Sequence, residues 1–117
     1  MADRLAALEA EIDAFVHERD WTKFHTPKNL AMSVAIEAAE IMEHFQWCTG
    51  EESLALEPAK RDEVANEIAD VLIYLLRLSR TLDIDVVAAA RTKLAENHRR
   101  YPVEKAKGKA TKYVDLD

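Results

Sequence analysis

The sequence is short of the residues that make tight turns and disulfide frameworks. Its 117 residues include two glycines, three prolines and one cysteine. The single cysteine, Cys48, excludes an internal disulfide framework and a zinc cluster built from thiolates. What remains is 49% hydrophobic and 32% charged, and it is rich in Ala, Leu, Glu, Lys and Arg, a mixture typical of helices. The composition therefore predicts a single all-α domain.

Long apolar runs and basic stretches are also missing. The longest apolar run, Val71–Leu76, is too short to cross a bilayer, and Met1–Ala10 carries charges where a signal peptide would be apolar. The net charge is −6, and no basic face is long enough for duplex nucleic acid. We therefore expect a cytoplasmic protein with no membrane or nucleic-acid partner. An acidic chain can still bind a phosphorylated substrate, because metal ions reverse the field locally.

Hydrophobic periodicity predicts four helices. They span about Asp3–Glu18, Lys28–Trp47, Pro58–Leu82 and, from a cap at Asp83 or Asp85, the residues up to Arg100. We divide the chain into a helical domain, residues 1–102, and a tail, residues 103–117, which is either disordered or laid across a partner subunit. The third helix is apolar on nearly all sides, and a chain of this size cannot cover it alone. This predicts a homo-oligomer.

Two pairs of acidic residues mark the second and third predicted helices: Glu37 with Glu40, and Glu67 with Asp70. Each pair has the i, i+3 spacing that places both carboxylates on one helix face, at the border of an apolar stripe. The alternative is a solvated acidic surface, but neither pair has the Lys or Arg at i+4 that is usual there. Desolvated carboxylates repel one another unless a cation holds them, so antiparallel packing of the two helices would make a metal site.

The residue types favour a hard divalent ion at such a site. A di-iron site would need Glu-x-x-His motifs on two helices, and neither pair has His at i+3. All-oxygen ligation favours Mg²⁺ or Mn²⁺ over iron or zinc, and Mg²⁺ commonly shares its ligands with substrate phosphates. The candidate metal ligands and catalytic residues are Glu37, Glu40, Glu67 and Asp70.

Several aromatic and polar residues could contact a substrate. Trp21 and Trp47 lie at helix boundaries, where Trp is often a half-buried core residue but can also stack on a nucleobase. Tyr74 lies one turn beyond the second acid pair, within reach of whatever the metal holds. Lys93 and Asn97 share a face of the fourth helix and could reach phosphate or sugar, or equally form a solvated edge.

The order of these motifs resembles that of the MazG-like superfamily of all-α nucleoside triphosphate pyrophosphatases. Glu-x-x-Glu, 26 residues and then Glu-x-x-Asp is the signature of that superfamily. From about Ile12 to Leu116, the flanking residues resemble its dCTP pyrophosphatase branch. The matching segments are Arg19–Asp20–Trp21, Phe24–His25, Pro27–Lys28–Asn29–Leu30, Phe45–Gln46–Trp47, Asp70–Val71–Leu72–Ile73–Tyr74, Asn97–His98–Arg99–Arg100–Tyr101–Pro102 and Lys112–Tyr113.

The resemblance implies a hydrolase dependent on Mg²⁺, or Mn²⁺, that cuts dCTP or a related nucleotide between the α and β phosphorus. Its products would be the monophosphate and pyrophosphate, and its role nucleotide-pool sanitation. The four acidic residues match the family's metal ligands. The residues that match substrate-contacting positions are Trp21, His25, Lys28, Asn29, Trp47, Tyr74, Lys93, Asn97, Arg100 and Tyr101. The resemblance also implies a dimer or a dimer-of-dimers helical bundle, with sites at subunit boundaries.

One position departs from the dCTP branch. Vertebrate dCTP enzymes have a substrate-binding His on the first helix, and this sequence has Ile12 there, whose aliphatic side chain cannot hydrogen-bond to a base edge. A broader house-cleaning pyrophosphatase acting on modified deoxynucleotides is therefore one alternative. Two others are phosphoribosyl-ATP pyrophosphohydrolase, a related helical enzyme, and a non-catalytic helical module that binds a partner through its third helix.

Overall fold

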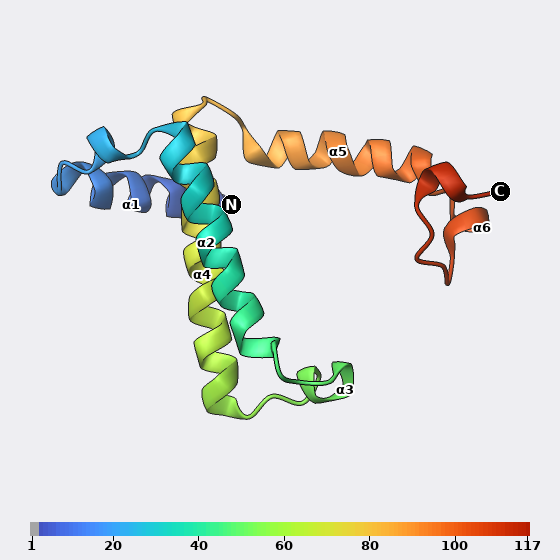
Figure 1. The fold of residues 1–117 in the computed structure, drawn as a ribbon. Helices are drawn as coiled ribbons and strands as arrows, with labels where there is room; N and C mark the ends of the chain where they lie inside the picture. The colour runs from blue at the N-terminus through green and yellow to red at the C-terminus, as the bar shows by residue number, and fades with distance from the viewer. Residues whose placement is uncertain (1–2) are drawn as a thin grey trace. The chain divides into compact units, whose positions relative to one another are not determined.

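The structure is a computed structural model that describes residues 3–117. Within this range the chain is all-helical and has no strand, as predicted. The six α-helices, labelled in Figure 1, are α1 (Arg4–Glu18), α2 (Pro27–Phe45), α3 (Gly50–Ser53), α4 (Pro58–Thr81), α5 (Val86–Arg100) and α6 (Val103–Ala106). Two 3₁₀ helices cover Thr22–Phe24 and Tyr113–Asp115. The four predicted helices correspond to α1, α2, α4 and α5, and the prediction missed the single-turn helices α3 and α6.

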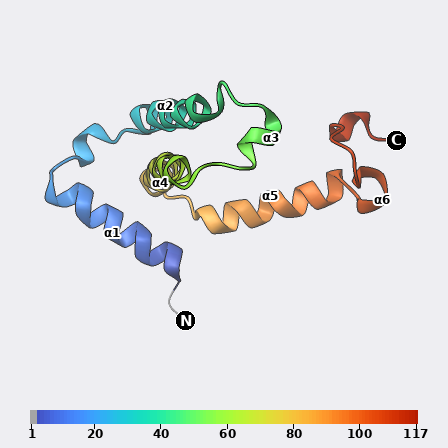
Figure 2. The same ribbon diagram turned by 90° about the horizontal axis from the view of Figure 1, so that it is seen from below.

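Contacts divide the chain into two compact units, which are described separately below. The first ends at Asp83 and contains α1 to α4, and the second is Ile84–Asp117. In the first unit α2 and α4 run antiparallel, side by side, as both Figure 1 and Figure 2 show. The short helix α3 lies in the connection between them, and α1 packs against α4. This antiparallel pair is the arrangement that the two acid pairs require.

Local side-chain chemistry sets the helix ends. The Thr26 hydroxyl accepts a hydrogen bond from the backbone N–H of Asn29 at 3.2 Å, and Pro27 follows it as the first residue of α2. Pro58 is likewise the first residue of α4, as predicted, but no side chain caps this helix. Asp85 caps α5 by accepting from the backbone of Ala88 at 3.0 Å. These caps satisfy N–H groups that the first turn of a helix leaves without a partner.

The core of the first unit runs along the α2–α4 pair and includes the contact of α1 with α4. Its buried apolar residues are Ile12 and Val16 from α1, Leu30 from α2, and Val64 and Leu76 from α4. Leu30 and Leu76 are almost completely buried, whereas most other apolar residues of α2 and α4 are not. This small core leaves much of the apolar surface of α2 and α4 exposed.

The C-terminal tail has structure of its own. In the second unit the ring of Tyr113 meets that of Tyr101 edge-on, with centroids 6.0 Å apart. The guanidinium of Arg100 lies 4.4 Å from the centroid of the same Tyr113 ring. The tail therefore packs against the end of α5 of its own chain, and its contact with a partner subunit stays a prediction. The division at residues 102 and 103 into domain and tail stays a prediction.

No helix among residues 3–117 combines the length and the apolar character that crossing a bilayer requires.

Candidate active site

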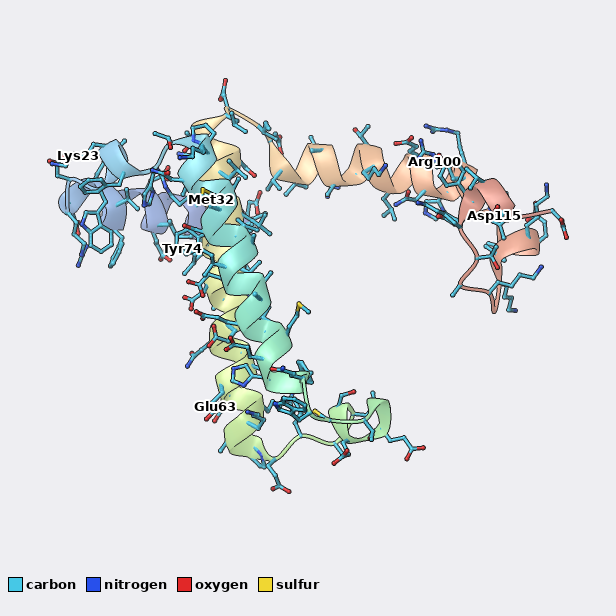
Figure 3. All side chains as sticks on the ribbon, viewed as in Figure 1. Lys23, Met32, Glu63, Tyr74, Arg100 and Asp115 are labelled. Atoms are coloured by element: carbon cyan, nitrogen blue, oxygen red, sulfur yellow. The ribbon has the colours of Figure 1, made fainter. Side chains whose placement is uncertain are left out.

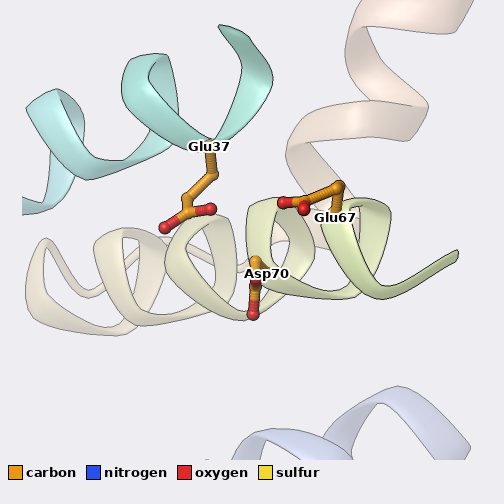
Figure 4. Close-up of side chains that lie close together, drawn as sticks. All are labelled: Glu37, Glu67 and Asp70. Carbon is orange, nitrogen blue, oxygen red and sulfur yellow. The ribbon is translucent and has the colours of Figure 1, made fainter. Parts of the chain in front are cut away.

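Three carboxylates from two helices meet where α2 packs along α4. Glu37 comes from α2, and Glu67 and Asp70 come from neighbouring turns of α4. One carboxylate oxygen from each residue lies within 4.8 Å of the other two. Figure 4 shows Glu37 extending from α2 toward α4, where Glu67 and Asp70 are located. These three residues are called the carboxylate triad below.

Glu40, one turn after Glu37, lies beside the triad. Its half-buried carboxylate contacts those of Glu37 and Glu67. Two carboxylates form a hydrogen bond only when one of them carries a proton. Burial raises the pKa of Glu37, and the contact with Glu40 and the nearby charges of Asp70 and Glu67 raise this pKa further. The surroundings of Glu37 therefore disfavour its ionised form.

Glu67 is perturbed in the same direction. The contact with Glu40 raises the pKa of Glu67, and burial is the second cause. His44 has the opposite effect on this pKa, and its Nε2 lies 3.7 Å from Oε1 of Glu67. The Oε2 atoms of Glu37 and Glu67 are both buried, and neither has a hydrogen-bond partner among residues 3–117. Buried acceptors without partners destabilise the folded state, so a positive group beside these two oxygens would stabilise the site.

The donors of the triad fit a hard divalent cation. All three are carboxylate oxygens, the ligands that Mg²⁺, Mn²⁺ and Ca²⁺ prefer, and none is a thiolate or imidazole. A cation between them would give the two buried oxygens a partner and would favour the ionised form of each acid. The chemistry of the triad therefore supports a divalent-metal site.

A cavity of about 440 Å³ adjoins the triad, because Asp70 is one of its lining residues. Its walls are mainly apolar and aromatic side chains from α1, the following connector and α4. The lining residues are Glu11, Ile12, Phe15, Val16, Trp21, His25, Asp70, Ile73, Tyr74 and Arg77. Trp21 packs edge-on against Phe15, with ring centroids 5.6 Å apart. The site thus joins a charged end that fits a metal to an aromatic cavity that fits a flat, partly apolar group.

Comparison with known proteins now identifies the family. A sequence model of the MazG-like family matches residues 32–116, which include all four predicted metal ligands. The chain belongs to the MazG-like family. It is similar to the dCTP pyrophosphatase 1 proteins of Bos taurus (41% identity) and Homo sapiens (38%), each over 104 residues that cover 87% of this chain. The chain spans 62% and 61% of the length of these two curated relatives.

A solved structure gives the same relationship for the fold. The crystal structure of a pyrophosphatase from Archaeoglobus fulgidus has a TM-score of 0.82 to this chain and 41% sequence identity. The similarity covers 87% of this chain and 95% of that one. The all-α fold of this MazG-like chain therefore agrees with that of a solved relative over nearly its whole length.

Three of the substrate-contacting residues predicted from the sequence come together at the cavity of this MazG-like chain. They are Trp21, His25 and Tyr74. Tyr74 lies on α4 one turn beyond Asp70. Figure 3 shows Tyr74 well separated along this helix from Glu63, which lies nearer the start of α4. A flat ligand in the cavity would thus have aromatic rings from two segments beside it, with Asp70 at hand for its charged end.

The other predicted residues of the first unit lie elsewhere. Trp47 follows the end of α2, which stops at Phe45, and 89% of its surface is exposed. Asn29 uses its side-chain amide to donate to the carbonyl of Phe24 at 3.1 Å, so it holds the connector in place. Lys28 is exposed at the start of α2. None of these three residues lines the cavity, and their contact with substrate stays a prediction.

The remaining predicted residues belong to the second unit. Lys93 and Arg100 both contact Glu96, Lys93 at 3.4 Å, and the backbone carbonyl of Asn97 accepts from the N–H of Tyr101. These contacts anchor the basic side chains on one face of α5. The hydrogen bond from Lys93 lowers the pKa of Glu96, and the positive charge of Arg100 lowers this pKa further. The substrate role of this group stays a prediction.

The sequence did not reveal Arg77, which also lines the cavity. Its guanidinium Nη1 donates to Oδ1 of Asp13 at 2.6 Å, and its Nε donates to Nδ1 of His25 at 3.1 Å. The position of Arg77 among the leucines of α4 could have pointed to such a role, because a charged side chain on an apolar helix face needs a buried partner. Its partner Asp13 lies 64 residues earlier, so spacing along one helix could not identify the pair.

Proposed function

We propose that this chain is a Mg²⁺-dependent nucleoside triphosphate pyrophosphohydrolase. Its substrate would be dCTP or a related deoxynucleotide, and its products the monophosphate and pyrophosphate. The observation that carries the proposal is the position of Asp70, which belongs to the carboxylate triad and also lines the aromatic cavity. One residue thus links a place for the charged triphosphate to a place for the base. The names of the similar proteins, dCTP pyrophosphatase 1 and pyrophosphatase, support the same activity.

The acidic residues of the site have two proposed roles, metal binding and proton transfer. Glu37, Glu67 and Asp70 would hold the divalent ion, with Mn²⁺ as a substitute for Mg²⁺. A bound ion would neutralise charge on the phosphate oxygens and lower the pKa of a coordinated water. Glu40 contacts two members of the triad without being one of them, and we assign it to accept a proton from the attacking water.

The cavity residues would bind the base. Trp21 and Tyr74 offer aromatic faces, on which any base can stack, so stacking alone discriminates poorly among bases. Ile12 offers no hydrogen bond in this cavity, and this favours a broader range of deoxynucleotides, including modified ones, as the second candidate. Lys93, Asn97, Arg100 and Tyr101 would contact phosphate or sugar, and Lys28, Asn29 and Trp47 would complete the site.

We also propose that the active form is a homo-oligomer, either a dimer or a tetramer. Exposed apolar side chains on both long helices support this, since Met32 and Ile36 on α2 and Ile68 and Leu72 on α4 are largely uncovered. Trp47, exposed at the far end of α2, is then available to a site that two subunits build together.

The activity is tested by identifying products. Purified protein with Mg²⁺ should release pyrophosphate and dCMP from dCTP, as separated by ion-exchange chromatography. Asp70→Asn and Glu40→Gln should each lower kcat/KM by about a thousandfold, the equivalent of several kcal/mol of transition-state stabilisation. Asp62→Asn, an exposed acid on the same helix, should leave the rate unchanged. Circular dichroism must show the same helicity in all variants.

Two results would contradict the proposal. Release of orthophosphate in place of pyrophosphate would mean that a different bond is cut. Full activity in Asp70→Asn would remove the triad from the chemistry. A panel of canonical and modified triphosphates, run under the same conditions, separates dCTP preference from the broader activity. A non-catalytic helical module would show no turnover with any of them.

A further inference from the structure

We infer that Arg77 is a positioning residue, which fixes His25 in the tautomer that offers Nε2–H to a nucleobase in the cavity. The inference rests on the proposed function for the nature of the ligand. The tautomer itself follows from contacts between three segments of the first unit: Asp13 on α1, His25 in the connector, and Arg77 on α4.

In the hydrogen bond between Arg77 and His25, only Arg77 can be the donor. A guanidinium keeps all its protons in proteins and has no acceptor atom, so Arg77 Nε must donate and His25 Nδ1 must accept. A neutral imidazole whose Nδ1 accepts carries its proton on Nε2. A protonated ring would direct its Nδ1–H and a positive charge at the N–H of the guanidinium, which is unfavourable. Burial and the charge of Arg77 accordingly lower the pKa of His25, in that order.

Arg77 is itself held rigidly. It is the only charged residue that is buried among residues 3–117, with 8% of its surface exposed. Asp13 accepts from Arg77 Nη1 at 2.6 Å through one oxygen, and its other oxygen lies 2.6 Å from Nη2 of Arg80. A buried guanidinium held by a short, charge-assisted hydrogen bond, to a carboxylate that a second arginine also holds, has little freedom to rotate away from His25.

This network could simply pin the connector and α1 to α4, and it does so. A structural role alone, however, does not need a particular ring nitrogen of His25 to remain free. With Nδ1 occupied, Nε2 is the one nitrogen left for a ligand, and His25 lines a cavity that is otherwise mainly apolar. The other charged residues facing this cavity are Glu11, Asp70 and Arg77. A fixed donor there selects a ligand with an acceptor, such as the ring nitrogen or carbonyl oxygen of a pyrimidine.

The tautomer can be tested without any ligand. Long-range ¹H–¹⁵N correlation spectra of the labelled protein distinguish Nε2–H from Nδ1–H rings, and His25→Gln assigns the signals. The wild-type protein should show His25 as a neutral Nε2–H tautomer near pH 7. Arg77→Met should mix the tautomers and raise the pKa of His25. Arg80→Met is the matched control, since Arg80 contacts Asp13 and Glu9, and it should leave His25 unchanged. An Nδ1–H ring in the wild-type protein would overturn the inference even if Arg77→Met fails to fold.

The role in binding needs a second measurement. Saturating dCMP should shift the His25 Nε2 signal in the wild-type protein, and deoxyribose 5-phosphate, which lacks the base, should not. Arg77→Met should raise the KM for dCTP about tenfold, the loss of one hydrogen bond, and change kcat much less. An unshifted His25 signal in protein saturated with dCMP would overturn the base-reading role while leaving the proposed function intact. Failure of the protein to bind or cleave any nucleotide would contradict both the base-reading role of His25 and the proposed function. The tautomer of His25 would be unaffected by that result.

Discussion

Glu37 and Glu67 each bury a carboxylate oxygen that has no hydrogen-bond partner among residues 3–117. In both residues, burial and the contact with Glu40 raise the pKa. A raised pKa in the folded state means that folding favours the protonated acid. The corresponding stability is complete at low pH, where both states hold the proton, and is lost as the pH rises through the raised pKa. The ionised forms of Glu37 and Glu67 therefore lower the stability of the fold as the pH rises.

A single substitution isolates this effect. Glu37→Gln removes the charge, so it should raise the melting temperature of the protein at about pH 7.5. The gain should shrink as the pH falls below about 4.5, because the wild-type acid is then protonated in both the folded and the unfolded state. Thermal unfolding followed by circular dichroism in the presence of a chelator measures both. Glu43→Gln, an exposed acid on the same helix, is the control. A gain that is independent of pH would contradict this explanation.

At the residue scale, the sequence revealed the acidic residues of the site but not the role of Arg77. The i, i+3 spacing of Glu37 with Glu40 and of Glu67 with Asp70 identified a cluster, because one helix face can be derived from spacing alone. The role of Arg77 depends on Asp13 and His25, which lie on other segments. Contacts of this kind depend on how the helices pack, and periodicity within one helix contains no information about them.

At the element scale, the long helices were predictable because both their periodicity and their caps are local. Pro27, Pro58 and Asp85 each mark a start that the structure confirms. The short helix α3 has only four residues, too few for a hydrophobic period, and it depends on a reciprocal cap between Thr49 and Glu52. Such a cap stabilises a single turn without any apolar pattern.

The end of α2 shows how a boundary affects a site. The sequence predicted a helix up to Trp47, but α2 stops at Phe45 and the chain turns through Gln46. Trp47 therefore lies outside the helix, exposed, and does not share the face that carries Glu37 and Glu40. The tail was unpredictable for a similar reason, because its order depends on Tyr113 meeting Tyr101 and Arg100 across a loop.

At the scale of the whole molecule, the amount of exposed apolar surface is the notable feature. Ile68, Leu72 and Leu75 follow one another at spacings of four and three residues on α4, and all three are exposed. Water contacts this stripe in an isolated chain, at a cost that burial against another copy would remove. The stripe therefore argues for self-association through α4.

Self-association is measured as mass in solution. Sedimentation equilibrium should give a mass at least twice the 13.3 kDa of one chain. Replacing Leu72 and Leu75 together with Lys should shift the protein toward monomer, because buried charge without a partner is strongly unfavourable. Val103→Lys, at an exposed apolar residue outside the stripe, should leave the mass unchanged. A monomeric wild-type protein would contradict the proposed oligomer and leave the triad unaffected.

The central claim is that Glu37, Glu67 and Asp70 together bind a divalent ion. Calorimetric titration of Mn²⁺ or Mg²⁺ at about pH 7 tests it most directly, since the ion binds through carboxylate charge that a Glu→Gln substitution removes. We predict saturable binding in the wild-type protein, unchanged in Asp62→Asn and lost in Glu67→Gln. Equal binding by wild-type protein and Glu67→Gln, or no binding by the wild-type protein, would contradict the account.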